Sequence, residues 1–208
     1  MRTPFLKYAL AGAVVLTLGA GGAVVAQAAL TQNPAEVRAG AYDLDSGHGK
    51  ITWSVNHLGF SKYVGQFVNV QAQLTLDPAN PSASTLTATI PLADVAPNDD
   101  RLKAHLQTAD FFDTANHPTA TFVSRSVTVD SDDPTEATVV GDLTLRGVTK
   151  PVTIEVDFNQ AGEAMGSYKA GFDGEATIKR SDFGINYALP AVSDEVELHI
   201  EGEFVIKS

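Results

Sequence analysis

The stretch EVELHIEGEFVIK, residues 195–207, alternates between apolar and mainly charged side chains along most of its length. Successive side chains of a β-strand point to opposite faces, so the pattern predicts a strand with one buried face and one solvated face. That division is typical of antiparallel sheets. The side chains expected on the buried face are Val196, Leu198, Ile200, Gly202, Phe204 and Ile206.

The same period of two recurs along the chain from residue 42 onward. Roughly eight alternating runs are separated by turn-forming stretches such as DPANPSAS (77–84) and SDDPT (131–135). No linker or internal repeat divides them, which predicts one all-β domain over 42–208. The clearest other runs lie within 50–57, 67–76, 84–92, 139–145, 152–158 and 168–178.

One segment interrupts the alternation and predicts a short helix. It opens at Pro97, with Asn98 as the expected N-cap and acidic side chains in the first turn. Leu102 and Leu106 form its apolar stripe, and the helix is expected to end near Gln107 after about three turns.

Small residues on the inward faces favour a barrel with space inside. Eight strands enclose an interior that is either just filled by side chains or holds one small ligand. Empty space there is costly unless something occupies it. The alternative is that the glycines only bend strands at corners. The small inward residues are Ala72, Ala88, Gly141, Ala170, Gly174, Ala176 and Gly202.

Composition excludes several classes of function. The chain has 208 residues and a net charge of −11, whereas nucleic-acid binding requires a basic face. A role as a polybasic reader of anionic lipid heads is excluded for the same reason. There are no cysteines, which rules out disulfides, thiolate catalysis and cysteine-ligated zinc.

Residues 1–28 predict a secretory signal peptide. A basic start, MRTPFLKY, precedes an apolar run over 9–26 and an A-x-A site at 26–28. Cleavage before Ala29 would leave residues 29–41, which have no periodicity, as a flexible lead-in to the domain. The alternative is an uncleaved N-terminal anchor, since about 18 apolar residues can just span a bilayer. Either leader predicts an extracytoplasmic domain, periplasmic or secreted.

No local motif announces a metal site or a catalytic centre. The five histidines show no H-x-H or H-E-x-x-H spacing, and no G-x-S-x-G occurs. We therefore predict no metal and no catalytic residue. His57 follows Trp53 and Val55 on an inward face, as either a core histidine or a polar contact at a tunnel mouth.

Four blocks of sequence resemble the YceI-like family of extracytoplasmic, polyisoprenoid-binding, lipocalin-like proteins. The resemblance covers nearly all of 42–208 and implies an eight-stranded antiparallel barrel whose end is capped by a short helical segment. It also implies an apolar tunnel for a long isoprenoid chain, such as a polyprenyl or quinone tail. The blocks are HLGFSKYVGQF (57–67), DRLKAHLQTADFFDTANHPTATF (100–122), VVGDLTLRGVTKPVTIEVDF (139–158) and IKRSDFGINYALPAVSDEVELHIEGEF (178–204).

Arg180-Ser181-Asp182-Phe183 matches a recurring block of that family, in which Arg180 and Asp182 are expected to form a structural ion pair or a turn clamp. The chain departs slightly from the family at His117, where an aromatic residue is commoner.

The candidate ligand contacts are mainly apolar and aromatic. Arg101 and His105, one helical turn apart, could meet a phosphate or quinone head group at the barrel mouth. Phe111 and Phe112 follow the helix and either contact the ligand or plug one barrel end. The full set is His57, Phe60, Tyr63, Phe67, Ala88, Arg101, His105, Phe111, Phe112, Ala170 and Ala176.

The resulting expectation is a binding protein without catalysis or cofactor. It would hold a long-chain isoprenoid lipid or isoprenoid quinone for transport, storage or sequestration, with the membrane only as the source of the lipid. The alternatives are an enzyme of isoprenoid-quinone metabolism and a ligand-free structural or stress-response envelope protein. The sequence does not decide between a monomer and a homodimer.

Overall fold

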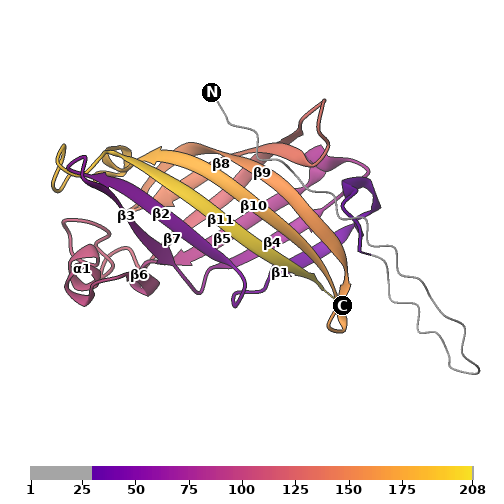
Figure 1. Ribbon diagram of the computed structural model, residues 1–208, viewed down its shortest axis with the longest axis horizontal. Coiled ribbons are helices and arrows are strands. Elements are labelled where there is room, and N and C mark those ends of the chain that lie inside the picture. Colours follow the sequence, from indigo (N-terminus) through magenta and orange to yellow (C-terminus); the bar gives the residue numbers. More distant parts are fainter. Residues whose placement is uncertain (1–29, 208) are drawn as a thin grey trace, which may run out of the picture.

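A closed antiparallel barrel forms the body of the computed structural model, which describes residues 30–207 (Figure 1). The predicted signal peptide at 1–28 lies outside these residues. The strands are β1 (Gly40–Leu44), β2 (Lys50–His57), β3 (Ser61–Phe67), β4 (Gln71–Leu76), β5 (Thr85–Pro91), β6 (Val95–Pro97), β7 (Thr119–Val129), β8 (Glu136–Leu145), β9 (Val148–Ala164), β10 (Ser167–Lys179) and β11 (Glu195–Ile206).

Eight strand positions close the barrel, as the sequence predicts. The order β1-β4-β5-β7-β8-β9-β10-β11 returns to its start because β1 also pairs with β11. β2 pairs with another part of β11, β3 pairs with β2, and β6 pairs with β3. Three positions around the barrel are thus each shared by two short strands, β1 with β2, β4 with β3, and β5 with β6.

The helix at the α1 end is shorter than predicted. α1 (Asp100–Leu106) has seven residues, about two turns instead of three. Its N-cap is Asp99, not Asn98, because the Asp99 carboxylate accepts the backbone N–H groups of Arg101 (2.8 Å) and Leu102 (3.0 Å). α1 lies at one end of the barrel, and its Leu106 is buried (Figure 1).

Four short 3₁₀ helices complete the helical structure of residues 30–207. They are η1 (Pro34–Glu36), η2 (Pro81–Ala83), η3 (Leu92–Asp94) and η4 (Arg180–Phe183). None of the helices within this part of the chain is long and apolar enough to cross a membrane.

The segment predicted as a flexible lead-in, 29–41, is attached to the barrel over its described part. Thr31 and Ala161 exchange two backbone hydrogen bonds of 2.8 Å. Val37 is buried against Tyr42 and Tyr168, and β1 already begins at Gly40. The prediction was wrong here because these contacts involve distant strands and leave no periodic pattern in the sequence.

Aromatic rings fill the space beside two inward glycines. A Cβ added to Gly141 would lie 2.4 Å from Cζ of Phe122, and one added to Gly202 would lie 2.8 Å from Cε2 of Phe204. These two glycines therefore make room for neighbouring rings.

Gly141→Ala is expected to lower the free energy of unfolding by about 1–3 kcal/mol, because the new methyl group overlaps Phe122 and the Val123 carbonyl. Gly171→Ala is the matched control on a nearby strand, since its Cβ would meet no atom closer than 3.8 Å. Urea denaturation of both variants tests this, and equal stability of Gly141→Ala and wild type would contradict it.

Tyr42 couples the stability of the barrel to alkaline pH. Its side chain is fully buried and its hydroxyl donates to the Arg38 carbonyl at 2.5 Å. Burial, followed by the neighbouring Tyr168, raises the pKa of Tyr42 to about 12. The unfolded chain, with its tyrosine pKa near about 10, therefore loses the phenolic proton first.

We expect stability that is fully present below about pH 10 to fall by up to about 3 kcal/mol as the pH rises to about 12. Denaturation across this range should show a shallower loss in Tyr42→Phe, which has no phenol to ionise. The same slope in both proteins would exclude Tyr42 as the cause.

Arg180 holds together the chain that follows η4. Its guanidinium donates to the carbonyl oxygens of Ile185 (3.1 Å), Tyr187 (2.8 Å), Val192 (2.9 Å) and Ser193 (2.8 Å). The predicted clamp role is therefore correct, but its partners are backbone carbonyls. The predicted ion pair with Asp182 is wrong, because that side chain is exposed while Arg180 is buried.

Candidate functional site

An apolar cavity of about 360 Å³ occupies the interior of the barrel. This volume falls within the range of about 300–1,000 Å³ typical of small-molecule sites. Most of its lining comes from the inward faces of the strands, where alternation places the apolar side chains. Representative lining residues are Ile51, Ala72, Leu74, Leu86, Ala88, Val139, Leu143, Ile154, Ala176, Leu198 and Ile200.

The cavity is closed toward α1. Val70 and Ile90 line it at that end, and both are buried in a cluster with Leu92, Phe183 and Ile185. Phe67, Phe111 and Phe112 pack against the same cluster.

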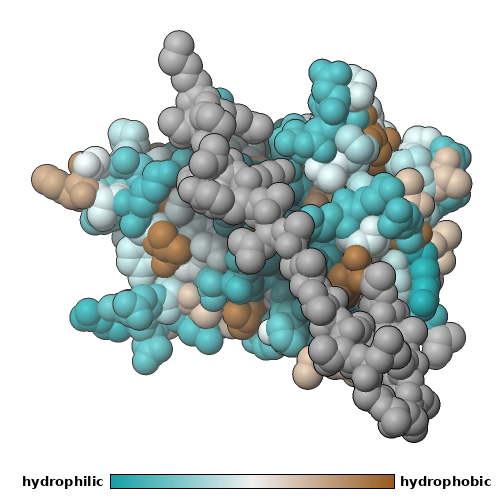
Figure 2. Space-filling view, turned by 45° about the vertical axis from the view of Figure 1, so that its right-hand side comes forward, coloured by the Kyte–Doolittle hydropathy of each residue, from teal (hydrophilic) through white to brown (hydrophobic). Residues whose placement is uncertain are grey.

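The cavity opens at the opposite end of the barrel. Its exposed lining residues are Ala35 of η1, Thr85 beside η2, Pro134 of the β7–β8 hairpin and Asp173 of β10. η1 and this hairpin lie at the right of Figure 1, away from α1. Figure 2 turns this end forward and shows a mainly hydrophilic outer surface with separate hydrophobic side chains.

The three alanines predicted to face the tunnel divide into two groups. Ala88 and Ala176 line the cavity. Ala170 does not, because it is fully buried against Tyr42, Ala161 and Phe204. Alternation identifies an inward face, but the neighbouring aromatic side chains decide whether that face meets empty space.

Most of the predicted aromatic contacts close the α1 end. Phe67 and Phe112 lie 5.5 Å apart between ring centroids, and Tyr63 stacks on Trp53 at 6.0 Å. Phe111 packs in the same clusters. Of the two readings of Phe111 and Phe112, the structure supports a plug of one barrel end, and none of these residues lines the cavity.

His57 and Phe60 lie outside the barrel interior. Phe60 is 89% exposed, and His57 is exposed at the end of β2. The inward position predicted for His57 is wrong because His57 is the last residue of β2, where the strand end is exposed. Leu58 and Gly59 then adopt positive φ values of 55° and 75°, which turn the chain back toward β3.

Arg101 and His105 are also far from the opening. The Arg101 side chain is 95% exposed and approaches Asp99 at 3.5 Å. His105 Nε2 lies 2.8 Å from Asp110 Oδ2, and its ring meets the edge of Phe111. Because both belong to α1, the prediction that they flank a head group at the barrel mouth placed that mouth at the wrong end.

Sequence reasoning missed the residues around the actual opening. Pro34, Pro78, Pro81 and Pro134 line it from loops and 3₁₀ helices. Proline in a turn predicts only local chain reversal, so no sequence signal indicated that these three segments meet.

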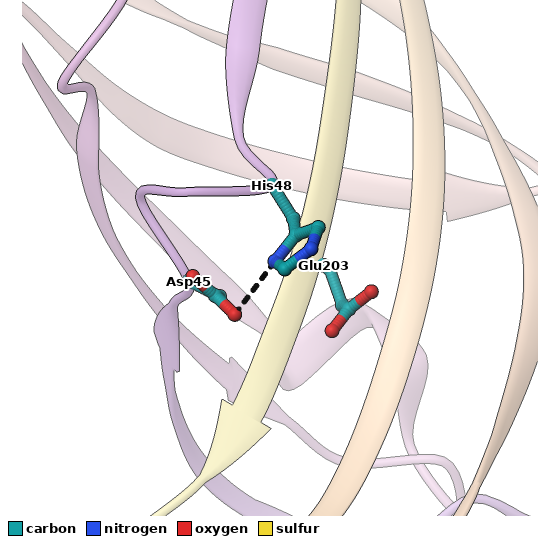
Figure 3. A group of neighbouring side chains, drawn as sticks. All are labelled: Asp45, His48 and Glu203. Carbon is teal, nitrogen blue, oxygen red and sulfur yellow. Dashed lines mark hydrogen bonds and ion pairs between the residues drawn. The ribbon is translucent and has the colours of Figure 1, made fainter. Parts of the chain in front are cut away.

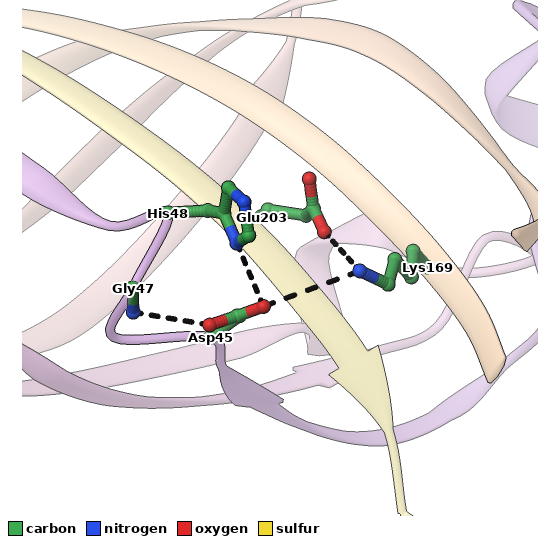
Figure 4. Close-up of polar contacts among 5 residues, drawn as sticks. All are labelled: Asp45, Gly47, His48, Lys169 and Glu203. Carbon is green, nitrogen blue, oxygen red and sulfur yellow. Dashed lines mark hydrogen bonds and ion pairs between the residues drawn. The ribbon is translucent and has the colours of Figure 1, made fainter. Parts of the chain in front are cut away.

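One group of potential metal ligands occurs among residues 30–207, formed by Asp45, His48 and Glu203 (Figure 3). His48 Nδ1 lies 2.9 Å from Asp45 Oδ2. This bond, together with the Gly47 backbone N–H, lowers the pKa of Asp45. The Lys169 ammonium pairs with Glu203 and lies 4.0 Å from Asp45 (Figure 4).

The Lys169 cation therefore already offsets part of the negative charge of the two carboxylates between which a metal ion would bind. The group connects the loop between β1 and β2 to β10 and β11, outside the cavity lining. Its contacts describe a structural tie on the barrel wall.

Comparison with known proteins identifies close relatives. A family model described as a YceI-like domain matches residues 42–204. Protein YceI of Escherichia coli O6:H1 is 40% identical over 164 residues, covering 78% of this chain and 84% of that protein.

Two solved structures share the barrel. The crystal structure of Burkholderia cenocepacia BcnA matches with a TM-score of 0.68 and 26% identity, covering 77% of this chain and 98% of that one. A polyisoprenoid binding domain from Saccharophagus degradans, implicated in plant cell wall breakdown, matches with a TM-score of 0.60 over 82% of this chain and 100% of that one. At 13% identity, the second match shows a common fold.

Proposed function

Because the chain belongs to the YceI-like family, we propose that it is a binding protein that holds the tail of a long-chain isoprenoid lipid inside its barrel, without catalysis. The observation that carries the proposal is an apolar cavity with one closed end. Such a cavity suits a linear hydrocarbon chain that enters tail first and leaves its polar end at the opening.

Apolar burial supplies the driving force for this binding. Each Å² of hydrocarbon removed from water contributes about 25 cal/mol, so several isoprene units can offset the cost of ordering the chain. The small side chains of Ala72, Ala88 and Ala176 leave the necessary width between β4, β5 and β10.

The finer parts of the proposal concern the ligand and the setting. The name of the Saccharophagus domain, which describes polyisoprenoid binding, supports an isoprenoid tail as the ligand, such as that of a polyprenol or an isoprenoid quinone. The predicted leader at 1–28 supports action outside the cytoplasm, where the protein would take lipid from a membrane for transport, storage or sequestration.

Mass spectrometry of organic extracts from the natively purified protein tests this proposal. We expect a stoichiometric isoprenoid lipid, and we expect lipid-stripped protein to take up a neutral isoprenoid from detergent. A stripped protein that binds no isoprenoid would favour the ligand-free structural alternative.

A further inference from the structure

Most of the charged residues in the cavity lining are acidic. Asp77, Asp173 and Glu201 belong to the lining, and Lys50 is its one basic residue among the positions that the structure describes. Lys50 is already ion-paired with Glu201. The Asp77 carboxylate accepts only backbone N–H groups, from Ala79 (3.1 Å) and Asn80 (3.0 Å). The lining therefore carries a net negative charge.

The strand register extends this charge around the barrel. Glu136 of β8 lies opposite Asp157 of β9, and Asp157 lies opposite Asp173 of β10. Asp173 in turn lies opposite Glu201 of β11. Like charges directly opposite one another cost stability. This row of four carboxylates thus adds negative charge to the outer face of the strands whose inner faces line the cavity.

The other cations at this end each have a carboxylate partner. Arg38 Nη1 lies 2.6 Å from Glu163, Lys207 lies 2.8 Å from Asp43, and Lys169 pairs with Glu203. Binding an anionic head group through one of them would require breaking an existing ion pair. A phosphate is recognised by charged donors, and arginine forks are the strongest of these. The described residues of the opening offer no unpaired one.

We propose that the acidic opening selects isoprenoids with neutral head groups, such as alcohols and quinones, and disfavours prenyl phosphates and diphosphates. This inference rests on the proposed binding function. Carboxylates near the opening repel a phosphate head held there, over a range set by the Debye length of about 8 Å at physiological salt. A hydroxyl or quinone carbonyl carries no charge and is not repelled.

Titration calorimetry with geranylgeraniol and geranylgeranyl diphosphate tests the inference, because the two probes share one tail. We expect wild type to bind the alcohol at least about tenfold more tightly at low salt, a difference of about 1.4 kcal/mol. Raising the ionic strength to about 0.5 M should reduce the difference between the two affinities, since exposed charges are then largely screened.

The double variant Asp77→Asn, Asp173→Asn should bring the affinities for the alcohol and the diphosphate closer together at low salt. It should do so by tightening the binding of the diphosphate and leaving the binding of the alcohol unchanged. The matched control is Asp182→Asn, Glu195→Gln, which removes two exposed acids near the closed end and should leave the ratio unchanged. Equal binding of both probes by wild type, or an unchanged ratio in the opening variant, would overturn the selectivity. Failure of both probes to bind would instead contradict the binding function, and the selectivity with it.

Discussion

Arg180→Met is expected to lower the free energy of unfolding by about 3–5 kcal/mol, the largest loss of stability that we predict for a single substitution. Arg180 is only 5% exposed, and its guanidinium satisfies four backbone carbonyls. Methionine has similar length but donates nothing, so these buried acceptors would lose their partners. Asp194 would also lose a favourable positive neighbour.

Arg146→Met is the matched control for this substitution. Arg146 also donates to two carbonyls, of Gly184 (2.9 Å) and Ala109 (3.1 Å), but both bonds are exposed. Water can replace the lost donor there, so we expect the free energy of unfolding to fall by no more than about 1 kcal/mol. Thermal and urea denaturation of both variants provide the measurement. Equal losses in the free energy of unfolding would contradict the view that Arg180 stabilises the protein because its hydrogen bonds are buried.

Ala176→Phe is expected to weaken isoprenoid binding by at least about tenfold, or about 1.4 kcal/mol. Ala176 lines the cavity together with its neighbours Ile154 and Leu198, so a phenylalanine ring would occupy space that the tail needs. Ala88→Phe should act in the same way from β5. Because the ring enters existing space, the unfolding midpoint should change less than in an overpacked core, where the cost is about 1–3 kcal/mol.

Thr177→Phe and Thr87→Phe provide controls with the same new side chain. Each lies one residue along the same strand and is exposed, so its ring points away from the cavity. Ala170→Phe is a further comparison. Ala170 is fully buried and lies outside the cavity, so this substitution should lower the stability of the protein. Full isoprenoid binding by Ala88→Phe and Ala176→Phe would place the ligand elsewhere.

The strands of the barrel were predictable because their cause is local. Alternation along 195–207 predicted β11 closely, since a strand repeats every two residues whatever its neighbours are. The three barrel positions that are each shared by two short strands could not be predicted in this way. The sequence does not indicate that β1 and β2 pair with one edge of β11, because that arrangement depends on a loop at 45–49 and on ion pairs between distant strands.

The candidate site was predictable only in part. Ala88 and Ala176 were correctly expected to face the cavity, but Arg101 and His105 lie at the other end of the barrel. Chain order places α1 near Phe111 and Phe112, and an aromatic pair after a helix fits a mouth or a plug equally well. The packing of Phe112 against Phe67, a residue of β3, favours the interpretation that these side chains close one end of the barrel.

The sequence by itself determined the all-β class, most of the inward set of side chains, the presence of a short helix and the acidic balance, because each depends on neighbouring residues or on composition. Only the tertiary structure decided which barrel end is open, which alanines line the cavity and which carboxylates of neighbouring strands lie side by side. Those features depend on side chains brought together by strand register, as Glu136, Asp157 and Asp173 are across β8, β9 and β10. Register is a property of paired strands, and no single strand carries it.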